Sequence, residues 1–255
     1  MADSGAGQIT GNFRMKKQIA FLGAAAAALM TAGTAHADGG YAGVAYSDNT
    51  TAGFHSWSVN GAYASQNFQI DGGYSRVESS VDVFDIGGHL FSRNDQWLWG
   101  GFLGYDHFSG SGSAGEWTGA LQTQFYLPRT TFSADLSYSQ TTSLPTDIKT
   151  TQIDGEARFF GTDNFSIQGN LGYGHVDSSG IGSGNYWTSG VGAEYQFDAA
   201  PISLYGGWQG YNVSGGTDAN AWTIGVRYNW GGTLLQRNRS GAGLNSPHGF
   251  LSAIF

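Results

Sequence analysis

A histidine and a serine stand two residues apart in the segment His107-Phe108-Ser109, a spacing that can support hydrolysis. A serine hydroxyl becomes a nucleophile when a nearby histidine accepts its proton. Residues i and i+2 of a strand point to the same face, so His107 and Ser109 would lie together if this segment is extended. The pair gives one catalytic hypothesis, although histidines beside serine-rich connections are also common on protein surfaces.

Acidic residues form a second and larger set, on the polar side of segments in which apolar and polar residues alternate. The eight acids are Asp71, Asp85, Asp106, Glu116, Asp135, Asp154, Glu156 and Glu194. The basic residues on the same side are Arg158 and Arg227, and His89 is also titratable. Eight carboxylates in a narrow enclosure would attract cations and repel anions. Alternatively, the acids hydrate a polar wall or pair with the two arginines.

The alternating segments must position these residues. Between residues 131 and 139, for example, Phe132, Leu136 and Tyr138 alternate with serine and aspartate residues. Period-two alternation over such lengths predicts β-strands with one apolar face. We expect twelve strands, at residues 41–46, 54–64, 67–76, 81–92, 96–108, 115–127, 130–140, 148–160, 164–176, 185–197, 201–212 and 220–230.

Strand lengths and connections indicate a membrane barrel. Tight connections alternate along the chain with mostly longer ones rich in Ser, Gly, Thr and Asp. An eleven-residue strand is about 36 Å long and, tilted by about 45°, crosses about 25 Å, the height of the apolar band of a membrane barrel. The pattern predicts an all-β fold, a transmembrane antiparallel up-and-down β-barrel of about 12 strands over residues 38–230, with both termini in the periplasm.

Alternation alone does not decide which face meets lipid, because a soluble barrel or a sandwich would place the apolar face inside. Aromatic residues near the strand ends favour lipid outside, since such residues form interfacial girdles. Trp97 and Trp99 stand at one border, and Tyr105, Tyr138 and Tyr173 at the other.

Composition excludes several function classes. The 255 residues include 42 Gly and no Cys, and 11 Lys and Arg stand against 19 Asp and Glu. Without cysteine there are no disulfides or thiolate metal sites. Few charges and many aromatic residues do not fit a disordered or nucleic-acid-binding chain. The histidines lack metal-binding spacing and the glycines are scattered rather than clustered in a phosphate loop, so we expect no metal, cofactor or nucleic acid.

The N-terminal region has the features of an export signal. Met15-Lys16-Lys17 is a positively charged start, residues 19–32 are apolar, and Ala35-His36-Ala37 fits a cleavage site with Ala35 and Ala37 at the small-residue positions. We expect residues 15–37 to be a signal peptide, preceded by an upstream extension at residues 1–14. A membrane anchor is the alternative.

The last predicted strand carries a recognisable motif. Thr223, Gly225, Tyr228 and Trp230 match polar-x-Gly-x-x-aromatic-x-aromatic. This resembles the terminal-strand signal read by the outer-membrane barrel assembly machinery. With the signal peptide and the strand pattern, the chain resembles small Gram-negative outer-membrane β-barrels of the porin-like class. The resemblance implies a cell outer membrane location reached through the periplasm, in contact with outer-membrane lipids and lipopolysaccharide.

Residues 231–255 follow a motif that usually ends such chains. They are polar and glycine-rich up to Gly249 and include Arg237 and Arg239. We expect either a flexible periplasmic tail, or a terminal segment that enters the barrel mouth or supplies the true assembly signal, which would change the strand register. No connection between strands is long enough to form a large plug.

Three functions remain open. The leading hypothesis is a channel for passive diffusion of small hydrophilic solutes, mildly cation-preferring, and not an enzyme. The first alternative is a structural or surface-interaction barrel without a pore. The second is an outer-membrane lipid hydrolase, because His107-x-Ser109 resembles the catalytic pair of outer-membrane lipid A deacylases. The sequence does not name the solute or the oligomeric state.

Overall fold

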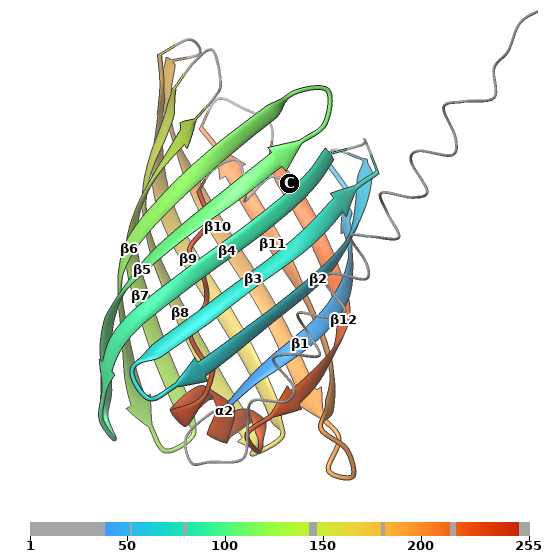
Figure 1. Cartoon of the computed structure of the whole chain (residues 1–255), viewed down its shortest axis with the longest axis vertical. Helices are drawn as coiled ribbons and strands as arrows, with labels where there is room; N and C mark the ends of the chain where they lie inside the picture. Colours follow the sequence, from blue (N-terminus) through green and yellow to red (C-terminus); the bar gives the residue numbers. More distant parts are fainter. Residues whose placement is uncertain are drawn as a thin grey trace, which may run out of the picture. The chain divides into compact units, whose positions relative to one another are not determined.

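A computed structural model describes residues 39–249, apart from residues 52, 79–80, 143–146, 180–181 and 215–217. These residues form one closed antiparallel barrel in which each strand pairs with its sequence neighbours and β1 pairs with β12 (Figure 1). The strands are β1 Gly39–Asn49, β2 Phe54–Ser65, β3 Phe68–Val77, β4 Val81–Arg93, β5 Trp97–Ser109, β6 Ser113–Leu127, β7 Thr130–Thr142, β8 Ile148–Thr162, β9 Phe165–Ser178, β10 Gly182–Gln196, β11 Ile202–Val213 and β12 Ala219–Trp230. The predicted fold class and its twelve strands are confirmed.

Most strand boundaries differ from the prediction by one to three residues, and β1 differs most. It was predicted over residues 41–46, but it spans Gly39–Asn49 because it pairs along its length with both β2 and β12. Several other strands also extend further than predicted at the end of the barrel away from Gly39. The connections at the two ends consequently differ less in length than the sequence indicates.

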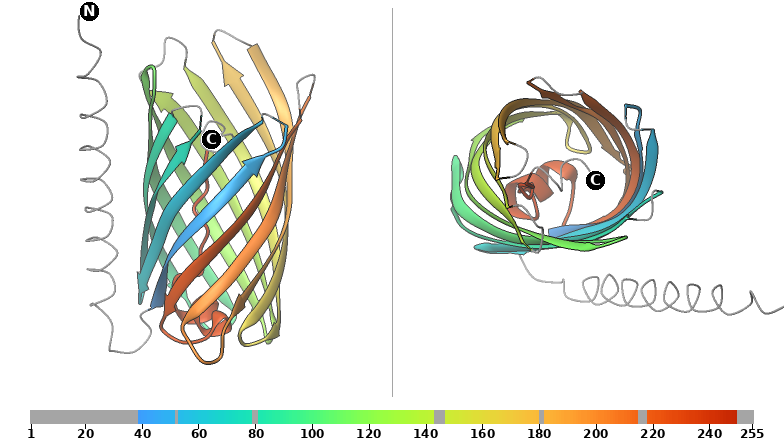
Figure 2. Two further views of the ribbon diagram at one scale, coloured as in Figure 1. Left: turned by 90° about the vertical axis from the view of Figure 1, so that its right-hand side faces the viewer. Right: turned by 90° about the horizontal axis from the view of Figure 1, so that it is seen from above.

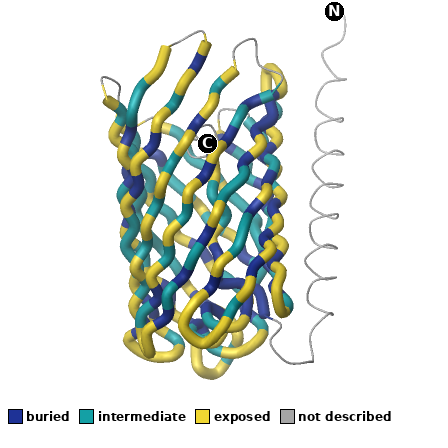
Figure 3. The backbone as a smooth tube through the Cα atoms, turned by 90° about the vertical axis from the view of Figure 1, so that its left-hand side faces the viewer, coloured by how far each residue is buried: buried dark blue, intermediate teal, exposed yellow. Residues whose placement is uncertain are grey.

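The apolar side chains of the strands point outward, as the alternation predicts. Leu90, Leu121 and Ile224 are 75%, 69% and 66% exposed, and every strand carries exposed large apolar residues. Exposed positions alternate with less exposed ones along the strands (Figure 3). So large an exposed apolar surface would be unfavourable in water and is suited to lipid. No helix in the described part of the chain is long and apolar enough to cross a membrane.

Aromatic pairs lie near both rims of the barrel. We call the end where β1 begins and β12 ends the proximal end, and the opposite end the distal end. Near the proximal end Trp97 stacks on Trp99 with ring centroids 5.6 Å apart. Towards the distal end Tyr105 packs on Trp117 at 4.6 Å. Such rings at both borders match the interfacial girdles of membrane barrels.

The chain continues past β12 into the barrel. A short helix, α2 (Leu234–Ser240), lies inside the proximal end, and residues 241–249 run from it along the lumen (Figure 2). We refer to residues 231–249 as the C-terminal segment and to residues 241–249 as its extended part. The structure therefore places this segment inside the barrel rather than in the periplasm, and β12 keeps the register expected for the last strand.

Candidate functional site

The lumen and the C-terminal segment within it form the candidate site. Two glycines start the segment: Gly231 and Gly232 have φ angles of 90° and 109°, which other residues rarely adopt. They reverse the chain after Trp230 and direct it into the barrel. Thr233 then caps α2, accepting a hydrogen bond from Gln236 N while the Gln236 side chain accepts one from Thr233 N.

A buried ion-pair cluster fixes α2 to the wall. The Arg237 guanidinium donates to both oxygens of Glu194, at 3.3 and 2.9 Å, and Arg227 reaches the same carboxylate at 3.0 Å. Ser203 Oγ donates to Glu194 at 2.6 Å, and Asn229 also contacts Arg237. Arg237 is 5% exposed. Because a bidentate arginine–carboxylate pair is geometrically specific, this cluster sets the position of the helix.

Burial affects the pKa values of the two arginines of α2. Burial lowers the pKa of Arg237, and the Glu194 carboxylate opposes this effect without cancelling it. Burial likewise lowers the pKa of Arg239. An arginine nevertheless stays protonated in proteins. Arg237 and Arg239 of the C-terminal segment thus add to the positive charges that the sequence predicts on the strands, Arg158 and Arg227.

Further contacts hold the end of α2. Thr131 Oγ1 donates to Asn238 Oδ1 at 2.5 Å, and both residues are buried. Arg239 donates to Leu127 O and to Thr130 O, and lies over the ring of Tyr126 at 4.5 Å. The helix is therefore attached to β7 and β6 as well as to β10 and β12.

The extended part is held mainly through its backbone. Arg93 donates to Gly241 O at 3.4 Å, and Ala242 N donates to Gly39 O at 3.2 Å. Three glutamines continue this series: Gln124 donates to Gly243 O at 3.1 Å, Gln69 exchanges two hydrogen bonds with Leu244 N and O at 3.2 and 2.8 Å, and Gln122 donates to Asn245 O at 2.9 Å. Each of residues 241–245 thus makes at least one main-chain hydrogen bond to the wall.

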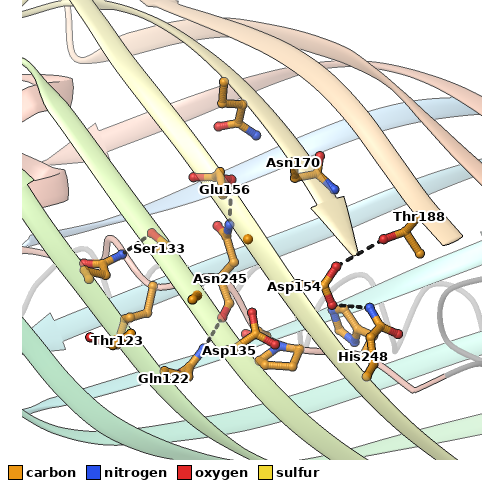
Figure 4. A pocket seen from close by; sticks show the side chains of 18 of the residues that line it. Gln122, Thr123, Ser133, Asp135, Asp154, Glu156, Asn170, Thr188, Asn245 and His248 are labelled. Carbon is orange, nitrogen blue, oxygen red and sulfur yellow. Dashed lines mark hydrogen bonds between the residues drawn. The ribbon is translucent and has the colours of Figure 1, made fainter. Parts of the chain in front are cut away.

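Side chains of the extended part meet both apolar and polar partners. The Leu244 side chain packs in a buried cluster with Phe91, Leu98 and Tyr126. Beyond it, Asn245 donates to Glu156 at 3.0 Å and Ser246 donates to Asp71, as the close view of the lumen shows for Asn245 (Figure 4).

His248 lies deeper in the lumen, where Asp106 Oδ1 is 3.8 Å from its Nδ1. Burial lowers the pKa of His248, but the Asp106 carboxylate and, further away, Asp85 and Asp71 outweigh this effect and raise the pKa to about 9. His248 is therefore positively charged at neutral pH.

Cavities remain on two sides of the extended part. One of about 390 Å³ lies between the extended part and the wall from β6 to β11, and Asp135, Asp154 and Glu156 border it (Figure 4). A second, about 290 Å³, lies on the β1–β4 side and is bordered by Asp71 and Asp85. Polar side chains dominate both linings, so water and small polar solutes fit there better than apolar ligands.

No protein-family model and no curated protein sequence matches the chain. Solved structures do match it. The NanC porin superposes with a TM-score of 0.61 at 9% sequence identity, over 73% of this chain and 98% of that one. The KdgM porin in complex with disordered oligogalacturonate gives a TM-score of 0.54 at 14% identity, over 75% and 99% of the two chains. The chain has the fold of a porin-like outer-membrane β-barrel. A loop L8 deletion mutant of OmpT, an outer membrane protein of Vibrio cholerae, is more distant, with a TM-score of 0.47 at 9% identity over 76% and 98%.

In this barrel the predicted acidic residues face the interior, and four of them are next to cationic or titratable partners. Asp71 lies 2.7 Å from His89, Glu156 lies 3.0 Å from Arg158, Asp106 lies 3.8 Å from His248, and Glu194 contacts Arg227 and Arg237.

The other four, together with Asp106, lie opposite one another on neighbouring strands. Asp85 is opposite Asp106, and Asp106 is opposite Glu116, across β4, β5 and β6. Asp135 is opposite Asp154 across β7 and β8.

The remaining predicted residues divide between the two faces and the undescribed region. Thr223 faces the lumen, where its hydroxyl lies 2.8 Å from that of Ser47, and Gly225 is also inward. Tyr228 is exposed on the outside, and its ring pairs with that of Trp230. The cleavage residues Ala35 and Ala37, with residues 1–14 and 250–255, lie outside the described residues.

The two residues of the hydrolase hypothesis lie on the outer face of β5 near the distal end. His107 is exposed and Ser109 is half-buried. No hydrogen bond joins the two side chains within the described structure. Nor do the described residues contain a cluster of three or more His, Asp and Glu side chains placed to hold a metal ion.

Sequence reasoning missed the glutamines that bind the C-terminal segment, and Arg237. Gln69, Gln122 and Gln124 read as ordinary polar positions of alternating strands, and nothing local marks them as partners of a segment more than a hundred residues away. A signal did exist for the helix. Thr233 and Gln236 have capping-box spacing directly after two glycines.

Proposed function

We propose that the protein is an outer-membrane channel for passive diffusion of small hydrophilic solutes, with a mild preference for cations. The proposal rests on one observation, a polar lumen with cavities beside the C-terminal segment, inside a wall whose outer face is apolar. A membrane barrel with a polar interior can pass solutes that fit beside its contents. The resemblance in fold to two proteins described as porins supports it.

The cation preference is supported by the charges along the cavity between the extended part and the wall from β6 to β11. Asp135 and Asp154 are opposite each other on β7 and β8 and border this cavity. The hydrogen bonds that Asp154 accepts come from the neutral side chains of Gln152 and Thr188. Two neighbouring carboxylates in a narrow enclosure give a negative potential that attracts cations.

The proposal includes the cellular setting that the sequence predicts. The chain is exported through the periplasm, assembled through the motif ending at Trp230, and surrounded by outer-membrane lipids and lipopolysaccharide. The proximal end then faces the periplasm, because an even number of strands places the start of the first strand and the end of the last strand on that side. No enzymatic step is part of this proposal.

Planar-bilayer recordings test the proposal. In a potassium chloride gradient we expect discrete conductance steps and a cation-selective reversal potential, which moves towards zero in the double variant Asp135→Asn and Asp154→Asn. The control Asp163→Asn removes a carboxylate whose side chain is 56% exposed in a proximal turn, and should leave selectivity unchanged. An anion-selective wild-type channel would contradict the cation preference.

A structural barrel without a pore remains the second candidate, because the C-terminal segment occupies the lumen. Complete absence of conductance from the folded wild-type protein and from variants with a weakened C-terminal segment would favour this candidate over the channel.

A further inference from the structure

The contacts of the extended part have the character of peptide recognition. The wall binds main-chain atoms at five consecutive residues, 241–245, so the contacts select an extended backbone more than a particular sequence. Main-chain hydrogen bonds combined with pockets for individual side chains are how proteins recognise extended peptides.

Two of the three glutamines are also held by other side chains of the wall. His89 Nδ1 lies 2.6 Å from Gln122 Oε1, which leaves Gln122 Nε2 to donate to the segment. Tyr126 Oη donates to Gln124 Oε1 at 2.8 Å, and Gln124 Nε2 donates both to Ser133 Oγ at 3.2 Å and to the segment. Because an amide held by a second partner loses little rotational freedom on binding, these side chains are preorganised for carbonyl groups.

The same glutamines are deeply buried. Gln69, Gln122 and Gln124 are 2%, 6% and 2% exposed. These exposures are those with the segment in place, so the segment covers the three amides and its backbone groups take hydrogen bonds that water would otherwise make.

An apolar subsite makes the site selective for the side chain at one position of the peptide. Phe91, Leu98 and Tyr126 surround Leu244. The next two side chains, Asn245 and Ser246, donate hydrogen bonds to Glu156 and Asp71. The ligand that fits is therefore an extended peptide with an aliphatic residue followed by small polar ones.

We infer that the lumen contains a binding site for an extended polypeptide, and that residues 241–249 of the same chain occupy it as an intramolecular ligand that narrows the pore. The narrowing rests on the proposed channel function, whereas the peptide binding does not. Release of this segment joins the cavities on its two sides and widens the route through the barrel.

The test uses the full chain and a substitution that unseats the segment. Leu244→Asp places a carboxylate in the apolar subsite, close to the acidic wall. The matched control Ser240→Asp adds the same charge to the same segment at an exposed residue. A fluorescently labelled, end-capped peptide with the sequence of residues 241–249 is added to each folded protein in detergent, and anisotropy is measured. Folding is checked by the shift of the barrel band on heating.

We expect the labelled peptide to bind the Leu244→Asp protein, while the wild type and Ser240→Asp bind it at least tenfold more weakly, because their own segment occupies the site. A peptide that itself carries aspartate at the leucine position should not bind. Absence of peptide binding to folded Leu244→Asp, or equal binding to all three proteins, overturns the inference. The full-length double variant Gln69→Ala and Gln122→Ala provides a second test, since it should release the segment but bind the peptide poorly.

Conductance measurements distinguish a failure of this inference from a failure of the proposed channel function. If both hold, Leu244→Asp conducts several-fold more than the wild type, and the unlabelled peptide lowers its conductance again. If the peptide binds but no protein conducts, the channel proposal fails and the peptide site stands. If the wild type conducts and Leu244→Asp conducts no more, the intramolecular plug is refuted.

Discussion

Replacing Arg237 with alanine should detach α2 from the wall. The change removes two hydrogen bonds to the Glu194 carboxylate, at 3.3 and 2.9 Å. A hydrogen bond to a charged group contributes about 1.5–3 kcal/mol. Breaking a buried pair costs about 3–5 kcal/mol when the remaining charge has no partner. Here Arg227 stays 3.0 Å from Glu194, so we expect the lower end of that range, about 3 kcal/mol.

A loss of about 3 kcal/mol lowers the ratio of bound to released segment about 100-fold, since about 1.4 kcal/mol corresponds to a factor of ten. Trypsin cleavage after Arg239 reports the released state, because cleavage follows the open population when reclosing is fast. We expect about 100-fold faster release of residues 240–255 from Arg237→Ala, measured by mass spectrometry on the folded barrel.

Arg129→Ala is the matched control, because it removes an arginine from an ion pair whose side chains are 49% and 56% exposed. Such surface pairs contribute about 0–1 kcal/mol. If Arg237→Ala is cleaved no faster than Arg129→Ala while both barrels stay folded, the Glu194 cluster does not hold the segment.

Three further predictions concern pH, selectivity and the lipid-facing wall. The raised pKa of His248, about 9 against a usual 6.5, means that its contact with Asp106 favours the bound segment below pH 6.5 and ceases to do so as pH rises through about 9. Trypsin cleavage after Arg239, corrected for the enzyme's own pH dependence, should accelerate across that window in the wild type but not in His248→Gln, and parallel curves would contradict this. Asp135→Asn alone should reduce cation selectivity in reversal-potential measurements by less than the double variant does, and an increase would be inconsistent with the proposed role of this carboxylate. Leu121→Arg places a charge at the centre of β6 on the outer face and should cost about 2–4 kcal/mol of folding free energy in lipid, against about 0–1 kcal/mol for Leu127→Arg at the strand end. Equal losses in urea titrations of refolding into vesicles would indicate that this face does not meet lipid.

The strands were predictable because their signal is local. Alternation places a residue on one of two faces, and this rule gave the outward position of Leu121 and the inward position of Asp135 without knowledge of any neighbour. The strand order follows as well, since tight connections join consecutive antiparallel strands. The ends of β1 were missed because pairing with β2 and β12 extends it beyond its own apolar pattern.

The occupied lumen was not predictable in the same way. Gln69 meets Leu244 across 175 residues of sequence, and each has an unremarkable local setting. The interior charge was also counted from the strands alone, so Arg237 and His248 were left out of it. Polar residues and glycines in a terminal segment are typical of a flexible tail, and only tertiary contacts distinguish a segment that binds its own barrel from one that does not.

The hydrogen bond from Ala242 to Gly39 has a consequence for biogenesis. It joins the last part of the described chain to its first strand, beside the seam where β1 meets β12. The segment follows β12 directly and also contacts the first residue of β1, so pairing of β1 with β12 brings its two attachment points together. Closure of the seam and seating of the segment are therefore coupled during assembly.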